Sequence, residues 1–424
     1  MIMASFRVKG VNLGGWLVTE GWIKPSLFDA IPNNHFLDGT SLQFKSVTTQ
    51  KYLCAEFGGG TIIAADCAIA STWGQFRAKN EKEVTADVSD VYNWFDDNDP
   101  TVFSITINSK LDGEFQVTNG YGLDQASKEH WNSFIVEDDF KFIAKSGLNA
   151  VRIPVGWWTA RDPYPPAPYV AGSLQVLDNA FLWAQKYGLK IILDLHATPG
   201  CQNSGAHSSA RDGTIEWGKT NETIQQTLDV IDFLTARESL YGIELLNEPL
   251  VPGVDIETLV KYYKAGYEVV RKHCSRVYVI LCSRLSFDVH DTHWAMELLS
   301  LANSLRRSVI DVHFYSYYYC VFRDMDTVQQ NIDYIKTNRA SQLDHIISNG
   351  PLAYVGEWSA KWFLKNSTKE EYQQFTKALL EVYEKATFGW TFWTYKIEEK
   401  YLEESEDLKP WCFKWMIQNG YINL

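Results

Sequence analysis

The sequence lacks an excess of positive charge. Its 424 residues include 39 Lys and Arg against 52 Asp and Glu, which gives a formal net charge of -13. A surface of this sign repels nucleic acid and anionic lipid over most of its area. We therefore expect no nucleic-acid partner and no attachment to a membrane surface.

Long hydrophobic runs are also missing. No stretch approaches the roughly 18 to 20 apolar residues that a membrane span requires. The opening segment, MIMASFRVKG, has no apolar core of the signal-peptide kind. We expect a monomer without a membrane span, which is cytoplasmic if Met1 is the native start.

Cysteine motifs are absent as well. The chain has seven cysteines, at Cys54, Cys67, Cys201, Cys274, Cys282, Cys320 and Cys412. None of them forms a CxxC pair or a Cys/His spacing of the kind that binds zinc, and no disulfide framework is indicated. We therefore expect neither a metal nor an organic cofactor.

The chain does have a regular alternation of elements. From about residue 130 onward, amphipathic helical stretches alternate with short apolar strands. The predicted strands are 6–16, 148–155, 189–196, 241–248, 277–282, 309–315, 352–358 and 388–395. The helical stretches carry apolar residues at spacings of three and four. Eight such units favour an α/β fold, a (β/α)8 TIM barrel, over an open sheet.

The stretch from 34 to 123 does not follow this period. It is rich in Gly and Thr and holds short alternating runs such as LQFKSV and VFSITI, which predict a small all-β insertion after the first strand. We therefore expect two domains. Residues 1–33 and 124–424 form the barrel, and residues 34–123 form the insertion.

Polar and aromatic residues mark the ends of the predicted barrel strands. They are Arg152, His196, Asn247, Glu248, His313, Tyr315, Glu357 and Trp393. The C-terminal ends of barrel strands meet at one face, where active sites are built from several strands at once. Each of these residues taken singly could be a satisfied core side chain, but the same feature on six strands indicates a site.

Two of these strand ends carry a glutamate, Glu248 in ELLNEP and Glu357 in VGEW. An unpaired carboxylate beside a buried strand is costly to desolvate. It therefore either caps a helix or pairs with a cation, or it works chemically. Two carboxylates at one barrel mouth suit acid/base and nucleophilic work on a glycosidic bond.

The neighbouring side chains have matching roles. Arg152 and His313 can keep a carboxylate ionised, and Tyr315 can donate a hydrogen bond to it. Asn247 can bind a sugar hydroxyl through a hydrogen bond that strengthens as positive charge develops on the ring. Trp393 can stack on the sugar. The histidines at these strand ends lack a third ligand at an informative spacing, so we predict no metal site among them.

The ordered motifs of the chain resemble those of glycoside hydrolase family 5, in its eukaryotic exo-β-1,3-glucanase-like branch. They are GVNLGGWLVTEGWI, NAVRIPVGWW, LDLHATPGCQN, IELLNEP, DVHFY, VGEWS and FWTYK. The resemblance implies a retaining mechanism with Glu248 as acid/base and Glu357 as nucleophile, and an extracellular location. It also implies a pocket for the first sugar lined by Glu20, Trp22, Arg152, His196, Asn247, His313, Tyr315 and Trp393.

The insertion is similar to a fascin-like β-trefoil repeat, a module that plant members of this branch carry at this point. The resemblance rests on KYLCAEFGGGTIIAADCAIASTWGQF. Because the stretch is too short for three full repeats, we expect a shortened module.

The sequence therefore predicts a retaining β-glycosidase that acts on β-glucosides from the non-reducing end. One alternative is a transglycosidase or a disaccharide-specific glycosidase acting on plant glycosides. A second, from another class, is a carbohydrate-binding protein without turnover.

One loop bears on the disaccharide-specific alternative. Counting from His196 places Ala206 where relatives carry an acidic side chain against the sugar. The vacated space would admit a substituent on the glucose, unless His207, Glu216 or another loop residue takes that role.

Overall fold

The structure is a computed structural model that describes most of the chain. The described residues are 6–29, 41–46, 49–55, 63–67, 75–77, 103–109, 111–118, 124–286 and 294–424. Within the predicted insertion, residues 34–40, 56–62 and 78–102 lie outside the described residues.

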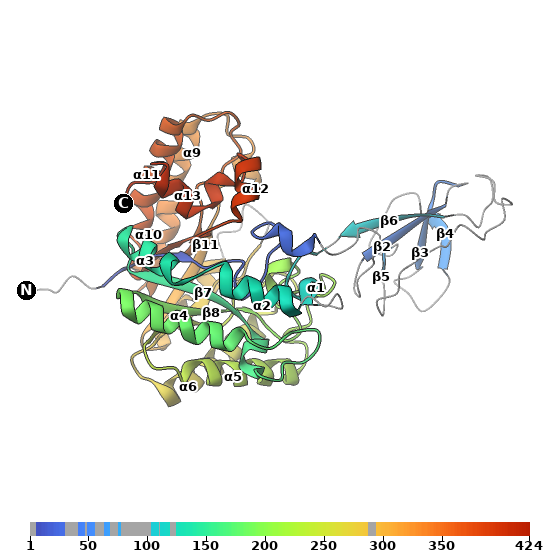
Figure 1. Ribbon diagram of the computed structural model, residues 1–424, viewed down its shortest axis with the longest axis horizontal. Coiled ribbons are helices and arrows are strands. Elements are labelled where there is room, and N and C mark those ends of the chain that lie inside the picture. The colour runs from blue at the N-terminus through green and yellow to red at the C-terminus, as the bar shows by residue number, and fades with distance from the viewer. Residues whose placement is uncertain are drawn as a thin grey trace, which may run out of the picture.

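Eight parallel strands close into a barrel, which confirms the predicted (β/α)8 fold (Figure 1). They are β1 (Val8–Asn12), β7 (Ala150–Gly156), β8 (Lys190–Ala197), β9 (Leu240–Glu244), β10 (Tyr278–Cys282), β11 (Ser308–Phe314), β12 (Leu352–Trp358) and β13 (Gly389–Phe392). Each strand lies beside the next one along the chain, and β1 closes the barrel between β13 and β7.

Closure brings the first and last barrel strands into close contact at one glycine. Gly389 begins β13 opposite Val8, with φ at 126°. A Cβ atom there would lie 2.0 Å from the carbonyl oxygen of Val8. Glycine alone combines this backbone angle with so close an approach, so this position lets the barrel close.

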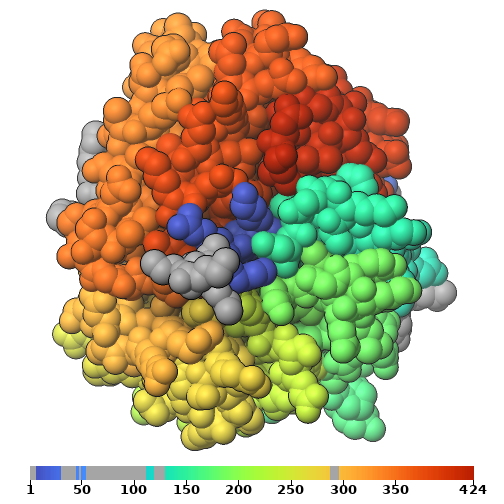
Figure 2. Space-filling model, turned by 90° about the vertical axis from the view of Figure 1, so that its left-hand side faces the viewer, coloured from blue at the N-terminus to red at the C-terminus, as the bar shows by residue number. Residues whose placement is uncertain are grey.

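Helices surround the barrel as its outer layer. The α-helices are α2 (Asp124–Ser133), α3 (Glu137–Lys145), α4 (Ser173–Tyr187), α5 (Asn221–Thr235), α6 (Ile256–His273), α7 (Trp294–Glu297), α8 (Leu299–Ser304), α9 (Val328–Tyr334), α10 (Ala340–Ser348), α11 (Lys369–Tyr383), α12 (Glu399–Glu404) and α13 (Phe413–Gln418). Figure 2 shows the chain passing around the molecule in sequence order, from green through yellow and orange to red. Among the described helices, none combines the length and the apolar composition of a membrane-spanning helix.

Short helical turns connect several of these elements. The 3-10 turns are η1 (Pro25–Phe28), η4 (Trp157–Arg161), η5 (Ala206–Ser208), η6 (Cys320–Phe322) and η8 (Lys409–Trp411), and a π-helical turn, η7 (Ile335–Arg339), joins α9 to α10. Hydroxyl or carboxylate side chains cap three of the longer helices. Thr220, Asp255 and Thr368 accept the backbone N–H three residues later at the starts of α5, α6 and α11.

The barrel interior is layered along the strands. An apolar layer contains Val8, Ala150, Ile192, Ile280, Val309, Tyr354 and Phe388. Successive residues of a strand alternate between its two faces, so the residues two positions later point inward as well. They include Arg152, Asp194, Cys282 and Asp311, and all four are buried. The second layer is therefore charged, and it lies between the apolar layer and the C-terminal ends of the strands.

A second sheet, separate from the barrel sheet, forms within the predicted insertion (Figure 1). Its antiparallel strands are β2 (Ser41–Ser46), β3 (Tyr52–Ala55), β4 (Ile63–Cys67), β5 (Gln75–Arg77) and β6 (Phe103–Ser109). Strand β2 pairs with β3, β5 and β6, and β4 pairs with β3. The fascin-like assignment and the domain boundaries stay predictions.

Candidate active site

A cavity opens where the barrel strands end. Its lining residues come from the loops after seven of the eight barrel strands or from the strand ends themselves. They are Glu20, Trp22, His196, Asn203, Ser204, Gly205, His207, Glu248, Leu285, Ser286, Tyr315, Tyr318, Tyr319, Glu357 and Trp393. The cavity thus lies at the face where the sequence predicts a site.

The ten predicted site residues divide into two groups around this cavity. Seven line it, namely Glu20, Trp22, His196, Glu248, Tyr315, Glu357 and Trp393. The other three, Arg152, Asn247 and His313, are buried behind the lining. They contact groups of the lining or each other, as the following distances show.

The two glutamates face each other. An oxygen of Glu248, an oxygen of Glu357 and a ring nitrogen of His313 all lie within 4.8 Å of one another. Glu357 belongs to strand β12, as predicted. Glu248 does not belong to a strand, because β9 ends at Glu244. The predicted strand 241–248 was too long at its C-terminal end, and Glu248 lies in the loop that follows.

The backbone of Glu248 is in the left-handed region, with φ at 41°. A residue with a Cβ adopts this conformation only when its surroundings enforce it. Two hydrogen bonds do so here. The Glu248 N–H donates to Cys282 Sγ at 3.4 Å, and Asn203 Nδ2 donates to the Glu248 carbonyl at 3.0 Å. The loop therefore holds this carboxylate toward Glu357 at a cost in local strain.

Arg152 fixes the position of Glu357. Its Nη1 donates to Glu357 Oε1 at 2.9 Å and its Nε donates to Glu244 Oε2 at 2.8 Å. Its Nη2 donates to Asn247 Oδ1 at 2.8 Å. The hydroxyl of Tyr315 donates to the other oxygen of Glu357 at 2.5 Å. Both oxygens of Glu357 are therefore held by donors from two different strands or their ends.

His313 links the two glutamates. Its Nδ1 lies 2.7 Å from Glu248 Oε1 and 3.5 Å from Glu357 Oε2. Burial alone would lower the pKa of His313, but the negative charges around it, Glu357 first, raise that pKa well above its ordinary value. The imidazolium thus supplies a proton between the two carboxylates.

The pKa values of the two glutamates differ in direction. Burial raises the pKa of Glu357, against the opposing charges of His313 and Arg152. For Glu248, burial is outweighed by the hydrogen bond and the charge of His313, which lower its pKa to about 2. The contact between Glu248 and His313 therefore favours an ionised Glu248 beside a protonated imidazole.

His196 and Trp393 form one wall of the cavity. Their rings stack with centroids 5.4 Å apart and planes 6° from parallel. The His196 Nδ1 lies 2.5 Å from Asp194 Oδ2, which orients the ring. The flat face of an indole, held beside a fixed imidazole, is a surface on which a sugar ring can stack.

Several buried polar atoms in and behind this lining have no hydrogen-bond partner among the described residues. Three of them are Glu20 Oε1, His196 Nε2 and Asn247 Nδ2. The other oxygen of Glu20 accepts a hydrogen bond from Trp22 Nε1 at 2.9 Å, and burial raises the pKa of Glu20 to about 7. Buried polar atoms are rarely left without a hydrogen bond. A ligand rich in hydroxyl groups would satisfy all three.

The loop after β8 contributes His207 to the cavity lining, where the sequence offers it as one of the alternatives to Ala206. Its Nε2 lies 3.3 Å from Glu248 Oε2, and burial lowers its pKa to about 4. Ala206 does not line the cavity. Instead, its carbonyl faces Gly113, where a Cβ atom would lie only 2.3 Å away. The alternative that His207 fills this part of the wall agrees with the structure better than a space left by Ala206.

Three further carboxylates were not predicted, although the sequence holds a signal for them. Asp194, Glu244 and Asp311 are all buried in the charged layer. Asp194 and Asp311 precede a predicted site histidine by two positions, in LDLH and IDVH. Because strand residues two apart share a face, this alternation places them beneath the recognised residues.

Residues 111–118 reach the cavity loops although they belong to the predicted insertion. Gly113 pairs with Glu20 in an isolated β-bridge. The short helix α1 (Glu114–Thr118) follows. The Glu114 carboxylate accepts two hydrogen bonds from Thr19, one from its backbone N–H at 2.9 Å and one from its hydroxyl. Gln116 Nε2 donates to the carbonyl of Ala210 at 3.0 Å. This segment joins the loop after β1 to the loop after β8.

Comparison with family models assigns most of the barrel. Residues 112–399 match the model described as cellulase (glycosyl hydrolase family 5). Residues 33–78 match a model described as a domain of unknown function, DUF7910. The second match lies in the predicted insertion, and its description names no activity.

Fungal relatives cover nearly the whole chain. A glucan 1,3-beta-glucosidase of Blumeria graminis is 28% identical over 98% of this chain and 86% of its own length. Glucan 1,3-beta-glucosidase 1 of Schizosaccharomyces pombe is 30% identical over 84% of this chain and 69% of its own length. Because these relatives are fungal, they give no support to the narrower resemblance to plant members.

A solved structure shares the fold. The rutinosidase from Aspergillus niger superposes with a TM-score of 0.65 at 18% identity, covering 99% of both chains. At this level of identity the likeness concerns the fold alone, and it agrees with the closed barrel.

Proposed function

Because the chain belongs to glycosyl hydrolase family 5 and is a retaining β-glycosidase, we propose that Glu357 is its nucleophile and Glu248 its acid/base. The separation of the two side chains supports this. Carboxyl groups of retaining enzymes lie about 5 to 5.5 Å apart, whereas inverting enzymes leave a wider gap for water. Here an oxygen of each lies within 4.8 Å of an oxygen of the other.

The proposed reaction has two steps. In the first, a Glu357 oxygen bonds to the anomeric carbon while the glycosidic bond breaks, and Glu248 gives a proton to the departing oxygen. In the second, Glu248 takes a proton from water, which attacks the anomeric carbon and releases Glu357. Arg152 and Tyr315 hold the oxygens of Glu357 throughout.

The proposed acid, Glu248, needs a proton, and His313 is the neighbouring group that can supply it. The pKa of Glu248 is lowered and that of Glu357 is raised, which is the reverse of the order that the proposed roles require. We infer that His313 Nδ1, 2.7 Å from Glu248, passes its proton to Glu248 when substrate fills the cavity. Exclusion of water by the sugar would favour this transfer, because it penalises the separated charges.

The substrate we propose is a β-glucoside, taken from its non-reducing end. The names of the fungal relatives, glucan 1,3-beta-glucosidases, support this choice. The unpartnered atoms of Glu20, His196 and Asn247 would bind the hydroxyls of the first sugar. The expected monomeric state belongs to the same proposal.

Trapping of the covalent intermediate tests the assignment of roles. A 2-deoxy-2-fluoro-β-glucoside with a good leaving group should leave one sugar on the peptide that contains Glu357, detected by mass spectrometry. Glu248→Gln serves as the control, because it should still be labelled when the leaving group needs no acid. A label on Glu248, as its lowered pKa would allow, reverses the two roles.

Transfer to an acceptor other than water is a second candidate, favoured by aromatic rings at the cavity. Tyr318 lines the cavity and is 50% exposed. Its ring lies 5.9 Å from that of Trp411, which also contacts Trp22 at 5.5 Å. Exposed aromatic faces can hold an acceptor sugar or phenol.

Acceptor competition separates transfer from hydrolysis. If transfer dominates, added alcohol or glucoside should raise the ratio of glycoside product to free glucose, and Tyr318→Ala should lower that ratio. Tyr164→Ala is the matched control, because Tyr164 is 88% exposed and does not line the cavity. If the ratio of glycoside product to free glucose is the same in the wild-type protein, Tyr318→Ala and Tyr164→Ala, hydrolysis remains the reaction.

A further inference from the structure

The charged layer of the barrel holds more acids than permanent cations. Five carboxyl groups in this layer or directly above it, at the cavity, are at most 8% exposed, those of Asp194, Glu244, Glu248, Asp311 and Glu357. Among the described residues, Arg152 is the permanent cation that pairs with them, through Asp194, Glu244 and Glu357. Several buried charges without a fixed counterion are costly. Protons or a cation must balance them.

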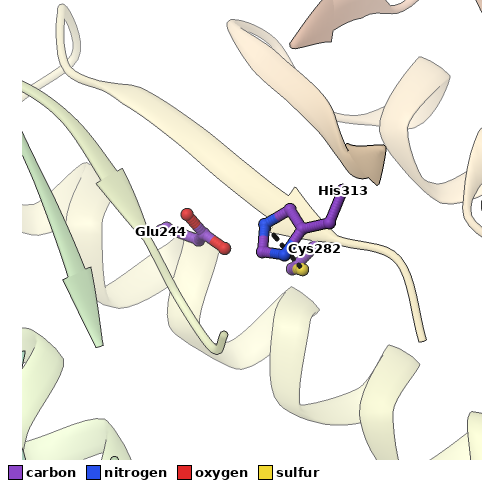
Figure 3. A group of neighbouring side chains, drawn as sticks. All are labelled: Glu244, Cys282 and His313. Carbon is purple, nitrogen blue, oxygen red and sulfur yellow. Dashed lines mark hydrogen bonds between the residues drawn. The ribbon is translucent and has the colours of Figure 1, made fainter. Parts of the chain in front are cut away.

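The deeper side of His313 faces a group of possible metal ligands. While Nδ1 points to Glu248, Nε2 lies 4.0 Å from Cys282 Sγ and 3.6 Å from Asp311 Oδ2. Glu244 supplies an oxygen from the neighbouring strand (Figure 3). The ligand atoms of Glu244, Cys282 and His313 lie within 4.8 Å of one another. Three adjacent strands, β9, β10 and β11, thus place one donor each around one point.

Two carboxylate oxygens beside this point have no hydrogen-bond partner among the described residues. They are Glu244 Oε1 and Asp311 Oδ2, and both side chains are fully buried. The second oxygen of each is occupied, by Arg152 Nε and by the N–H of Gly356 respectively. An unsatisfied buried oxygen needs a proton or a cation. Glu244 Oε1 is therefore available to bind a cation, whereas Asp311 Oδ2 has only the His313 ring near it, at 3.6 Å.

The donor set is selective. A thiolate, an imidazole and a carboxylate are the ligands that zinc takes in tetrahedral sites, whereas magnesium and calcium take oxygen ligands. Tetrahedral zinc holds its ligands about 3.5 Å apart, so the side chains would need to move inward by roughly 1 Å. Metal-bound histidines commonly donate their other N–H to a carboxylate, and Glu248 already occupies that position.

We propose that Glu244, Cys282 and His313 form a binding site for a zinc-like divalent cation beneath the catalytic pair, with Asp311 as a fourth ligand, and that the bound cation inhibits the enzyme. Binding would release the proton of the thiol and the Nε2 proton of His313. Drawing His313 and Cys282 toward the cation would also displace Glu248, which hydrogen-bonds to both of them, from its place opposite Glu357. This consequence for turnover rests on the proposed role of Glu248, whereas the binding does not.

Cadmium binding tests the site without reference to activity. The protein, freed of metal by a chelator, is titrated with Cd²⁺, and the ultraviolet thiolate-to-cadmium absorption is recorded. Cys282→Ala should lose one equivalent of this absorption, and Glu244→Gln should weaken that equivalent on the order of 10- to 100-fold. Cys412→Ala is the matched control, since Cys412 is equally buried and belongs to no group of three possible metal ligands among the described residues. A thermal melt verifies that each variant is folded.

Two results of the cadmium titration would overturn the proposal. The first is a thiolate-to-cadmium absorption that Cys282→Ala leaves intact, and the second is a loss of that absorption in Cys412→Ala as large as in Cys282→Ala.

A third test measures turnover. Zn²⁺ should slow the wild-type enzyme at least 10-fold, reversibly with EDTA, and should slow Cys282→Ala far less. Equal inhibition of both would place the ion between Glu248, His313 and Glu357 at the cavity instead.

Discussion

The barrel and the inserted sheet contribute to the cavity in different ways. In the barrel, every strand is held by a neighbour on each side, and the residues at the strand ends are therefore fixed relative to one another. None of the described residues of β2 to β6 lines the cavity. Among the described residues of the predicted insertion, the short segment 111–118 contacts the cavity loops. The comparison teaches that closure of the barrel positions the catalytic residues, while the described part of the insertion reaches the cavity loops through this one segment.

Loss of the nucleophile should have the largest effect. We expect Glu357→Ala to lower kcat on the order of 10⁴-fold or more, because the covalent step is removed. Added azide should restore part of the turnover and release an α-glycosyl azide, which is identified by NMR. Turnover within 100-fold of wild type would mean that the barrel site is built around another residue.

Deletion of the insertion sharpens the comparison directly. Replacing 34–110 with a short linker should leave kcat/KM for a small aryl glucoside within about 2-fold, since the sheet lines no part of the cavity. Extending the deletion through residue 118 removes the hydrogen bonds to Thr19 and Ala210. This longer deletion should lower kcat/KM on the order of 10- to 100-fold, because small displacements of binding groups are costly.

Equal activity of the two deletion proteins would show that segment 111–118 does not position the cavity loops. Thermal melts of both proteins are the control, because a general loss of the fold would lower activity in either one.

A pH effect on stability should follow from the contact segment. Burial raises the pKa of Glu114 from 4.5 to about 7. The folded chain therefore binds this proton more tightly, so the contribution to stability is full below pH 4.5 and is lost as the pH rises through about 7. The free energy of unfolding should therefore fall with pH between these two values, and Glu114→Gln should reduce that slope by up to about 1.4 kcal/mol per pH unit.

The measurement is urea unfolding at a series of pH values between these two pKa values. Asp138→Asn is the control, since Asp138 is exposed on helix α3. An unchanged slope in Glu114→Gln would mean that the Glu114 contact with Thr19 opens before the chain unfolds.

The smallest expected effect concerns the wall of the cavity. His207→Ala should change the ratio of kcat/KM for a simple aryl glucoside to that for a 6-O-substituted glucoside by about 3- to 10-fold, because a packed neighbour of Glu248 is removed. Ala206→Ser should leave the ratio unchanged, since Ala206 does not line the cavity. The opposite pattern would restore the interpretation that Ala206 marks the specificity position.

Much of the barrel was predictable because its signals are local. Alternation along a strand and three-and-four spacing along a helix depend only on neighbouring residues. The eight strands were therefore found within a few residues of their bounds, and the polar residues at their ends indicated the face that carries the cavity. The end of β9 was missed, because an apolar run such as ELL reads as strand whether or not it pairs.

Contacts between distant segments were not predictable from the same signals. Glu244, Cys282 and His313 are 38 and 31 positions apart along the chain, and their meeting follows from the register of β9, β10 and β11. The contacts of His207 with Glu248 and of Glu114 with Thr19 also join residues that are distant along the chain, so short sequence patterns do not reveal them.

The sequence by itself thus determined the strands, the helices, the resemblance to family 5 and the two glutamates, because each of these is written in short stretches of residues. The tertiary structure alone decided which carboxylate receives which donor, where the proton of Glu248 rests, and which part of the predicted insertion reaches the cavity. These depend on distances across the closed barrel, where the interaction of buried charges varies with their separation and burial and not with their order along the chain.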